Sequence, residues 1–146
     1  HVLMQRSGQQ VVTRSLRIAR IIGQDEVPSV SDSSVALEIL SSMLDVWRHD
    51  SEFVPDDCDD FSVPSFSDLS TPVDADPALL AAIYYTLAVM LAPEFGSQVE
   101  ALVQRTATAY RRVWTRKVAA LSIGRMDLEM GYLPYRGGSY DIETDQ

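Results

Sequence analysis

Few residues in this chain could carry out chemistry. A catalytic nucleophile needs a neighbouring base and a third group that orients the base, and the only histidines are His1 and His49. His49 follows Trp47 at the end of a predicted helix, where a histidine usually caps carbonyl groups or lies exposed. Composition alone allows a Ser-His-Asp set around His49, and nothing else supports one. We therefore predict no catalytic residue and no enzymatic activity.

The acidic residues give no specific signal for a metal site or a hydrolytic site. Asp56, Asp57, Asp59 and Asp60 surround Cys58 and could offer oxygen ligands to a hard cation. The run lacks the glycine and the downstream glutamate of an EF-hand loop, so a solvated loop is the better interpretation. Paired carboxylates could hydrolyse a glycoside, but 21 acidic residues make some pair inevitable. We predict no metal and no cofactor.

Isolated glycines and tryptophans also indicate structure rather than ligand binding. Gly8 and Gly23 stand alone and form no phosphate-binding loop. Trp47 and Trp114 occupy apolar positions of predicted helices, so we expect them to pack in the core.

Charge is segregated along the sequence. The net charge is −9, yet residues 2–22 contain four arginines and no acid, and residues 101–125 contain six cations and no acid. Between these blocks, residues 25–76 contain fourteen acids and a single arginine. Such blocks suit side-by-side packing of identical subunits, with the acidic loop of one against the basic helix of the next. Two alternatives stay open: the blocks neutralise each other within one monomer, or a basic face binds nucleic acid, which the overall acidity disfavours.

The length and composition are those of one domain. The 146 residues are 46% hydrophobic, which is ample for a single core. No apolar run reaches the roughly 20 residues that span a bilayer, we recognise no secretory signal, and we expect no membrane partner. One cysteine excludes an intrachain disulfide. The chain begins with His1 rather than Met, so the sequence does not establish what precedes it.

Apolar periodicity predicts four helices within residues 1–123, which we take as one α-helical domain. The first predicted helix spans Gln10–Ile22. The second begins after the N-cap Ser29, with Asp32 three residues further on as in a capping box, and ends near His49.

The third and fourth predicted helices are also marked by their ends. The third begins with Asp76 as N-cap and Pro77 at the first helical position, and we expect it to stop by Ala92 because a proline follows. The fourth begins with the capping-box pattern Ser97–Glu100 and runs to about Leu121.

Two segments lack helical periodicity. Residues 50–75 contain three prolines and many Ser and Asp, so we predict a long loop inserted in the domain, which could include a short β-hairpin. Residues 124–146 contain helix-breaking Gly and Pro with dispersed tyrosines, so we predict an extended C-terminal arm that orders on a partner. The predicted fold class is mainly α, a four-helix bundle-like domain with a long middle loop and an extended arm.

The order and spacing of several segments resemble one family, the packaged-DNA-stabilisation adaptors (head-tail connectors, or tail accessory and head-completion proteins) of short-tailed bacteriophages. The resemblance covers residues 10–96 and the arm, and the 50–75 loop departs from it. The segments that carry it are Ile21-Ile22-Gly23, Pro28-Ser29, Ala36–Leu40, Met43–Trp47, Ala78–Ala88, Leu91–Gly96 and Tyr135–Asp145.

The resemblance implies a head-tail connector fold and a structural virion protein of the neck, the junction of head and tail, assembled in the host cytoplasm. Twelve such subunits would form a dodecameric ring beneath the portal protein. The ring would extend the DNA channel, help to retain packaged DNA and offer a docking surface to tail or nozzle proteins. Double-stranded DNA would pass through without sequence-specific binding, and an acidic wall suits this because it repels phosphate.

The predicted sites are therefore interfaces. Arg105, Arg112 and Arg116 are candidates for the inter-subunit or channel face. The alternative function is a small helical DNA-binding regulator or packaging factor that uses these arginines together with those of the first helix, Arg14, Arg17 and Arg20. The arm residues expected to contact the portal or a neighbouring subunit are Tyr132, Tyr135, Arg136, Tyr140 and Ile142.

Overall fold

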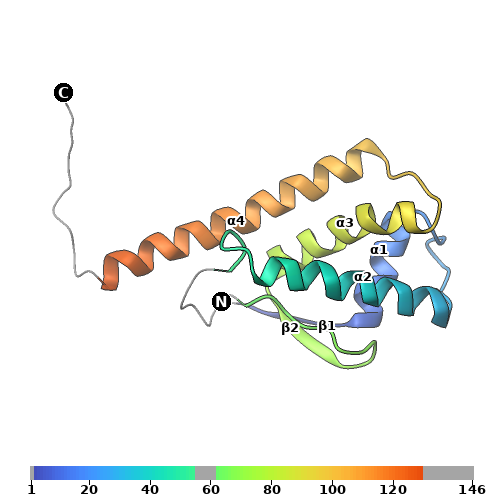
Figure 1. The fold of residues 1–146 in the computed structure, drawn as a ribbon, viewed down its shortest axis with the longest axis horizontal. Coiled ribbons are helices and arrows are strands. Elements are labelled where there is room, and N and C mark those ends of the chain that lie inside the picture. Colours follow the sequence, from blue (N-terminus) through green and yellow to red (C-terminus); the bar gives the residue numbers. More distant parts are fainter. Residues whose placement is uncertain (1, 55–61, 130–146) are drawn as a thin grey trace.

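The described part of the protein is mainly helical, as predicted, with four helices and a small antiparallel sheet. The computed structural model describes residues 2–54 and 62–129. Helix α4 runs alongside α3, and its last turns project beyond the rest of the described domain (Figure 1). The elements in chain order are β1 (Met4–Ser7), α1 (Gly8–Ile18), α2 (Val30–Arg48), β2 (Pro72–Ala75), α3 (Pro77–Glu94) and α4 (Ala101–Glu129).

Helix α1 starts earlier and ends earlier than predicted. The Ser7 hydroxyl accepts a hydrogen bond from the Gln10 backbone N–H (3.2 Å), and the Gln10 side chain accepts one from the Ser7 N–H (2.8 Å), which is a capping box. The predicted end at Ile22 is wrong. Arg20 has a φ of 59°, and this left-handed residue ends the helix at Ile18.

The predicted starts of α2 and α3 are confirmed. The Ser29 hydroxyl accepts from the Asp32 N–H (3.1 Å). The Asp76 carboxylate accepts from the Ala78 N–H (2.8 Å), and Pro77 occupies the first turn of α3. Both caps satisfy backbone donors that have no partner inside the helix.

Helix α3 continues past the predicted stop at Ala92. It passes through Pro93 to Glu94 and is closed by Phe95, whose N–H donates to the carbonyl groups of the preceding turn. Pro93 removes one N–H donor, but so close to the C-terminus its fixed φ still fits the final turn. Gly96 then takes a φ of 71°, which ends the helix.

Helix α4 differs from the prediction at both ends. The Ser97 N–H donates to the Ala92 carbonyl (2.8 Å), so Ser97 belongs to the end of α3 and α4 begins only at Ala101. At its other end α4 continues beyond the predicted Leu121 to Glu129. Residues 124–129, which we assigned to an extended arm, are therefore helical. The remainder of that arm, 130–146, lies outside the described residues.

Strands β1 and β2 pair antiparallel, with Met4 opposite Ala75 and Ser7 opposite Pro72. The hairpin that we allowed within residues 50–75 is not what forms in the described part of that segment. Its last residues instead pair with the N-terminal segment, which carries no strand pattern of its own.

The described parts of the 50–75 loop pack into the core. Phe53, Val63 and Phe66 are buried, and the Phe53 ring stacks on Trp47 with 4.6 Å between ring centroids. The Trp114 indole N–H donates to the Phe53 carbonyl (3.0 Å). The prediction that both tryptophans serve packing is confirmed.

Helix α3 is the centre of the core and contacts the other three helices. It is long and apolar enough to span a membrane by length and composition, but more than half of it is buried inside the protein. Tyr84 is only partly buried. The buried residues of α3 are Leu79, Leu80, Ala82, Ile83, Thr86, Leu87, Ala88, Leu91 and Ala92.

A polar turn at Asp68 packs against the start of α1. The Asp68 carboxylate accepts hydrogen bonds from the Thr71 N–H (2.7 Å) and the Ser70 N–H (2.9 Å), and these bonds, led by that from Thr71, lower its pKa. The next residue, Leu69, accepts from the Gln9 N–H at 2.9 Å. The turn therefore lies directly against the first residue of α1.

Replacing Gly8 by alanine is expected to destabilise the fold. An added Cβ would lie 2.6 Å from the Asp68 backbone oxygen, and a backbone atom cannot move aside cheaply. We expect a loss of about 1–3 kcal/mol in the free energy of unfolding, measured by urea denaturation. Gly23→Ala is the control, since its Cβ would meet only the flexible Glu26 side chain at 3.4 Å. Equal stabilities of the two variants would contradict the prediction.

Candidate functional site

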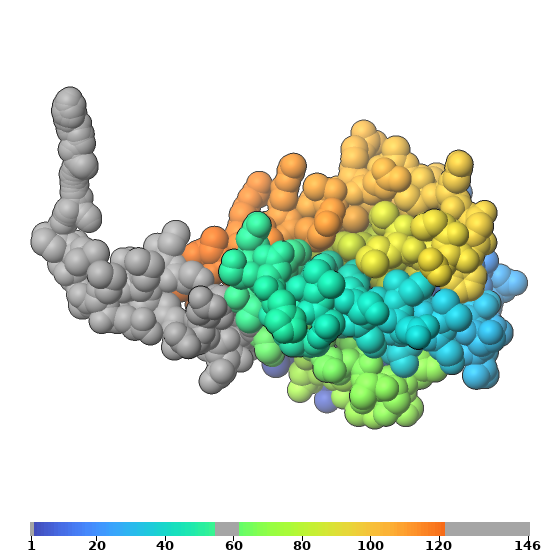
Figure 2. All heavy atoms as spheres, viewed as in Figure 1, coloured from blue at the N-terminus to red at the C-terminus, as the bar shows by residue number. Residues whose placement is uncertain are grey.

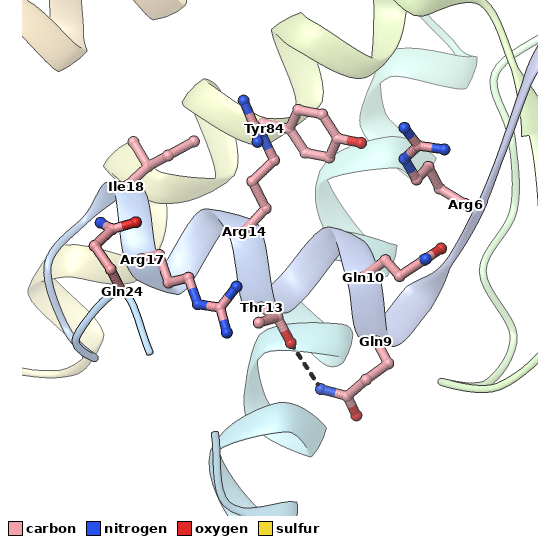
Figure 3. A pocket seen from close by; sticks show the side chains of 9 residues that line it. All are labelled: Arg6, Gln9, Gln10, Thr13, Arg14, Arg17, Ile18, Gln24 and Tyr84. Atoms are coloured by element: carbon pink, nitrogen blue, oxygen red, sulfur yellow. Dashed lines mark hydrogen bonds between the residues drawn. The ribbon is translucent and has the colours of Figure 1, made fainter. Parts of the chain in front are cut away.

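The first candidate surface is a hollow of about 480 Å³ beside α1. Its described lining has three arginines and no acidic residue, and it comes from β1, α1, the segment after α1, and α3 (Figure 3). A hollow with this lining attracts negative charge. The lining residues are Arg6, Gln9, Gln10, Thr13, Arg14, Arg17, Ile18, Gln24 and Tyr84.

The Arg14 side chain is held over the Tyr84 ring. Its guanidinium carbon lies 5.0 Å from the ring centroid, in the range of a cation–π contact (Figure 3). The backbone beneath is fixed, because the buried Ser15 hydroxyl donates to the Tyr84 carbonyl (3.1 Å) and ties α1 to α3. Arg14 is itself exposed, so its charge remains available to a partner.

The other two arginines of the hollow are held by backbone groups. Arg17 donates from Nη2 to the Glu26 carbonyl (2.9 Å), while its Nε is buried and has no hydrogen-bond partner. Arg6 donates to the Gln5 carbonyl (2.7 Å). Within the described residues, none of Arg6, Arg14 and Arg17 forms an ion pair. Their positive charges are therefore not neutralised there.

A second hollow, of about 290 Å³, continues from the first. The two share Arg6, Arg14 and Tyr84, and the second adds the aromatic pair Tyr85 and Tyr110, whose ring centroids are 5.4 Å apart. We call the two hollows together the basic-aromatic groove. One end of it, with Arg17 and the amides, is cationic. Arg6 and Arg14 line both hollows, and the other end adds Tyr85, Tyr110 and apolar side chains.

The second candidate surface is the outer side of α4. Arg105, Arg112 and Arg116 are all exposed, and spacings of 7 and 11 residues place them on one side of a helix. Leu102, 66% exposed, and Val113, 46% exposed, lie along the same side. We call these five residues the α4 outer face. Its arginines form no ion pair with any residue in the described part of the chain.

The charge blocks of the sequence are joined only sparsely within the described monomer. Lys117 contacts the buried Asp76 carboxylate (2.6 Å), which links the basic block of α4 to the acidic block. Arg20 lies 3.4 Å from Glu100, and both side chains are exposed, so that pair contributes little. Among the described residues, these contacts within one monomer therefore leave most of the positive charges of α4 without a negatively charged partner.

The structure brings together some residues that we predicted and separates others. Arg14 and Arg17, which we assigned to a basic face of the first helix, line the groove, whereas Arg20 lies outside the groove lining. His49 follows α2 as its C-cap, with Nδ1 2.9 Å from the Asp45 carbonyl oxygen, as expected for a capping histidine. No group of His, Cys, Asp or Glu in the described residues could hold a metal ion.

Some functional candidates fall outside the described residues, and others were missed. Cys58 with its neighbouring aspartates lies outside them, as do the arm residues Tyr132, Tyr135, Arg136, Tyr140 and Ile142. Sequence reasoning missed the aromatic end of the groove. The tyrosines there come from two helices, and only the run of arginines without acids hinted at this surface.

No protein-family model matches the chain, and no curated protein matches it either. The described residues form a mainly helical domain with two cationic surfaces and a long final helix, α4, whose last turns project.

Proposed function

We propose that the protein is a structural head-tail adaptor whose copies form a ring beneath the portal of a short-tailed phage. The observation that carries the proposal is the α4 outer face, which combines exposed apolar side chains with arginines that form no ion pair among the described residues. The ordered sequence segments described above support the same assignment. In this function the ring extends the DNA channel, helps to retain packaged DNA and receives the tail proteins. The protein has no enzymatic role.

Helix α2 supplies a surface that complements the α4 outer face. Glu38 and Asp45 are exposed and seven residues apart, the same spacing as Arg105 and Arg112, so both pairs repeat after about 10 Å of helix. Val46, 68% exposed, accompanies the acids as Val113 accompanies the arginines. A contact that pairs these two helices would join apolar and oppositely charged side chains.

The two helices that carry these faces lie on different sides of the molecule, which suits a ring. Helix α2 covers the front of the view and α4 runs along its upper edge (Figure 1, Figure 2). A surface that binds a different surface on the next copy makes a head-to-tail contact, and such contacts form a ring when the rotation between successive copies closes. Residual acidic charge on the ring wall would let DNA slide along it.

The test is the assembly formed by the full chain with its cognate portal, observed by native mass spectrometry and negative-stain imaging. We expect a ring stacked on the portal. The triple variant R105E/R112E/R116E should lose the ring while keeping its helical circular dichroism. Exchanging both faces in one chain, R105E/R112E with E38R/D45R, should restore it. A chain that stays monomeric with the portal present would overturn the proposal.

The second candidate function, a small DNA-binding regulator or packaging factor, rests on the same arginines, which have no acidic partner in the described part of the chain. It requires an affinity for duplex DNA that falls steeply with salt concentration. The double variant R105E/R112E should then abolish DNA binding, and E38R/D45R should not restore it. Retained portal binding together with no DNA binding at modest salt would remove this alternative.

A further inference from the structure

The basic-aromatic groove has no assigned occupant, and its chemistry is specific. Arg6, Arg14 and Arg17 leave three guanidinium groups without an acidic partner in the described chain. Beside them, Tyr84 and Tyr110 line the aromatic end. An occupant that satisfies both ends must carry several negative charges and also apolar or aromatic side chains, in a form narrow enough for a groove.

The last eight residues of the chain have this composition. The sequence of residues 139–146 contains three acids and no cation. Acidic positions Asp141, Glu143 and Asp145 alternate with Tyr140 and Ile142. Bound in an extended conformation, alternate side chains point to opposite sides. The three carboxylates share one side of the segment and could face the arginines, and Tyr140, at the start of the segment, could then reach the end of the groove that holds Tyr85 and Tyr110.

The direction of α4 favours a groove on another copy of the chain. Helix α4 ends at Glu129, 19 residues beyond the groove residue Tyr110, which is about 28 Å along a helix. Residues 130–138 span at most about 32 Å when fully extended. A chain could therefore reach its own groove only if residues 130–138 ran back along α4 almost fully extended, whereas a groove on a neighbouring copy is not subject to that restriction. Figure 1 shows the end of α4 on the opposite side of the domain from α1.

We propose that the acidic C-terminal segment 139–146 of one copy docks in the basic-aromatic groove of a neighbouring copy. Its carboxylates bind Arg6, Arg14 and Arg17, and Tyr140 packs at the Tyr85–Tyr110 end. The inference rests on the proposed function in that the neighbouring copy is the next subunit of the ring. It assigns the arm to a subunit neighbour and names the surface that receives it.

The experiment uses a synthetic, fluorescently labelled peptide of residues 135–146, titrated with the full chain and followed by anisotropy at low salt. The full chain carries D141N/E143Q/D145N so that its own segment does not compete. We expect saturable binding that weakens as salt is added. Arg14→Glu in the groove should weaken binding about tenfold or more. Arg112→Glu, the same charge change on the α4 outer face, should leave it unchanged.

Several outcomes would overturn the inference. They are no peptide binding at all, equal binding by the Arg14→Glu and Arg112→Glu chains, or equal binding of a peptide that itself carries D141N/E143Q/D145N. If a duplex oligonucleotide binds the groove with the same Arg14 dependence while the peptide does not, the groove is a DNA site instead.

The source of the segment is tested with the chain whose own tail is intact. If that chain, diluted until it is monomeric, binds the peptide far more weakly than the tail-neutralised chain, its own segment fills its groove and the neighbour assignment is wrong. Equal binding supports docking between copies. No portal is present in this assay, so an absence of peptide binding counts against the inference alone. If the peptide binds but no ring forms on the portal, the result counts against the adaptor function alone.

Discussion

Replacing Trp114 by alanine is expected to lower the free energy of unfolding by about 3–5 kcal/mol. The side chain is only 1% exposed and connects α4 to the segment after α2, because its indole N–H donates to the Phe53 carbonyl at 3.0 Å. Alanine would leave a cavity and also an unsatisfied buried carbonyl. Since domains are typically stable by about 5–15 kcal/mol, this is a large fraction of the total. Urea denaturation followed by far-UV circular dichroism measures it.

Two further variants separate the contributions at this position. Trp114→Phe keeps most of the ring volume and removes the N–H donor, so it should cost about 1–3 kcal/mol, less than alanine. Val113→Ala removes an exposed neighbour on the same helix and should change stability by less than about 0.5 kcal/mol. A Trp114→Ala chain as stable as Val113→Ala would show that α4 does not need this anchor.

Replacing Asp76 by alanine is expected to cost about 2–3 kcal/mol. One carboxylate oxygen accepts from the Ala78 N–H (2.8 Å) and caps α3, and the other contacts the Lys117 ammonium (2.6 Å) on α4. The carboxylate is 5% exposed, so the pair is shielded from water on the acidic side. Losing it removes the cap of the central helix and a link between α3 and α4 at once.

Asp76→Asn distinguishes these two roles, because an amide oxygen can still cap the helix but carries no charge. We expect Asp76→Asn to lower the free energy of unfolding by less than Asp76→Ala does. Because the contact with Lys117 then has no negative charge, its contribution to stability should no longer depend on salt concentration. Lys117→Met, which keeps the aliphatic stem, should be destabilising by about 1–3 kcal/mol, since the buried carboxylate loses its bond from the ammonium. If both Asp76 variants had the same melting temperature as the native chain, the Asp76–Lys117 pair would make no measurable contribution to stability.

The correct and incorrect predictions of the helix ends show which of these ends are decided by neighbouring residues in the sequence. Ser29 and Asp76 were identified correctly because a cap is decided by one side chain and backbone N–H groups within three residues of it. The end of α1 was not identified, because it depends on a left-handed Arg20 that no residue type there demands. Ser97 matches a capping pattern, yet its N–H serves the end of α3. A pattern that fits a cap does not show which helix uses it.

Of the two candidate surfaces, one could be predicted from the sequence and the other could not. The arginines of the α4 outer face could be listed from the sequence, and their exposure on one side follows from helical spacing once α4 is known to be continuous. The basic-aromatic groove could not be predicted. It needs Arg6 from β1, Arg14 from α1, Tyr84 from α3 and Tyr110 from α4 at one place.

The sequence by itself therefore determined the mainly helical class, two of the helix starts, the tryptophan core positions and the segregated charge, because each depends on neighbouring residues or on composition. Tertiary structure decided the pairing of β1 with β2, the burial of Phe53, Val63 and Phe66, and the groove. These contacts join residues far apart in the chain. They form only when burial of apolar surface across the whole domain offsets the entropy of closing the intervening loops.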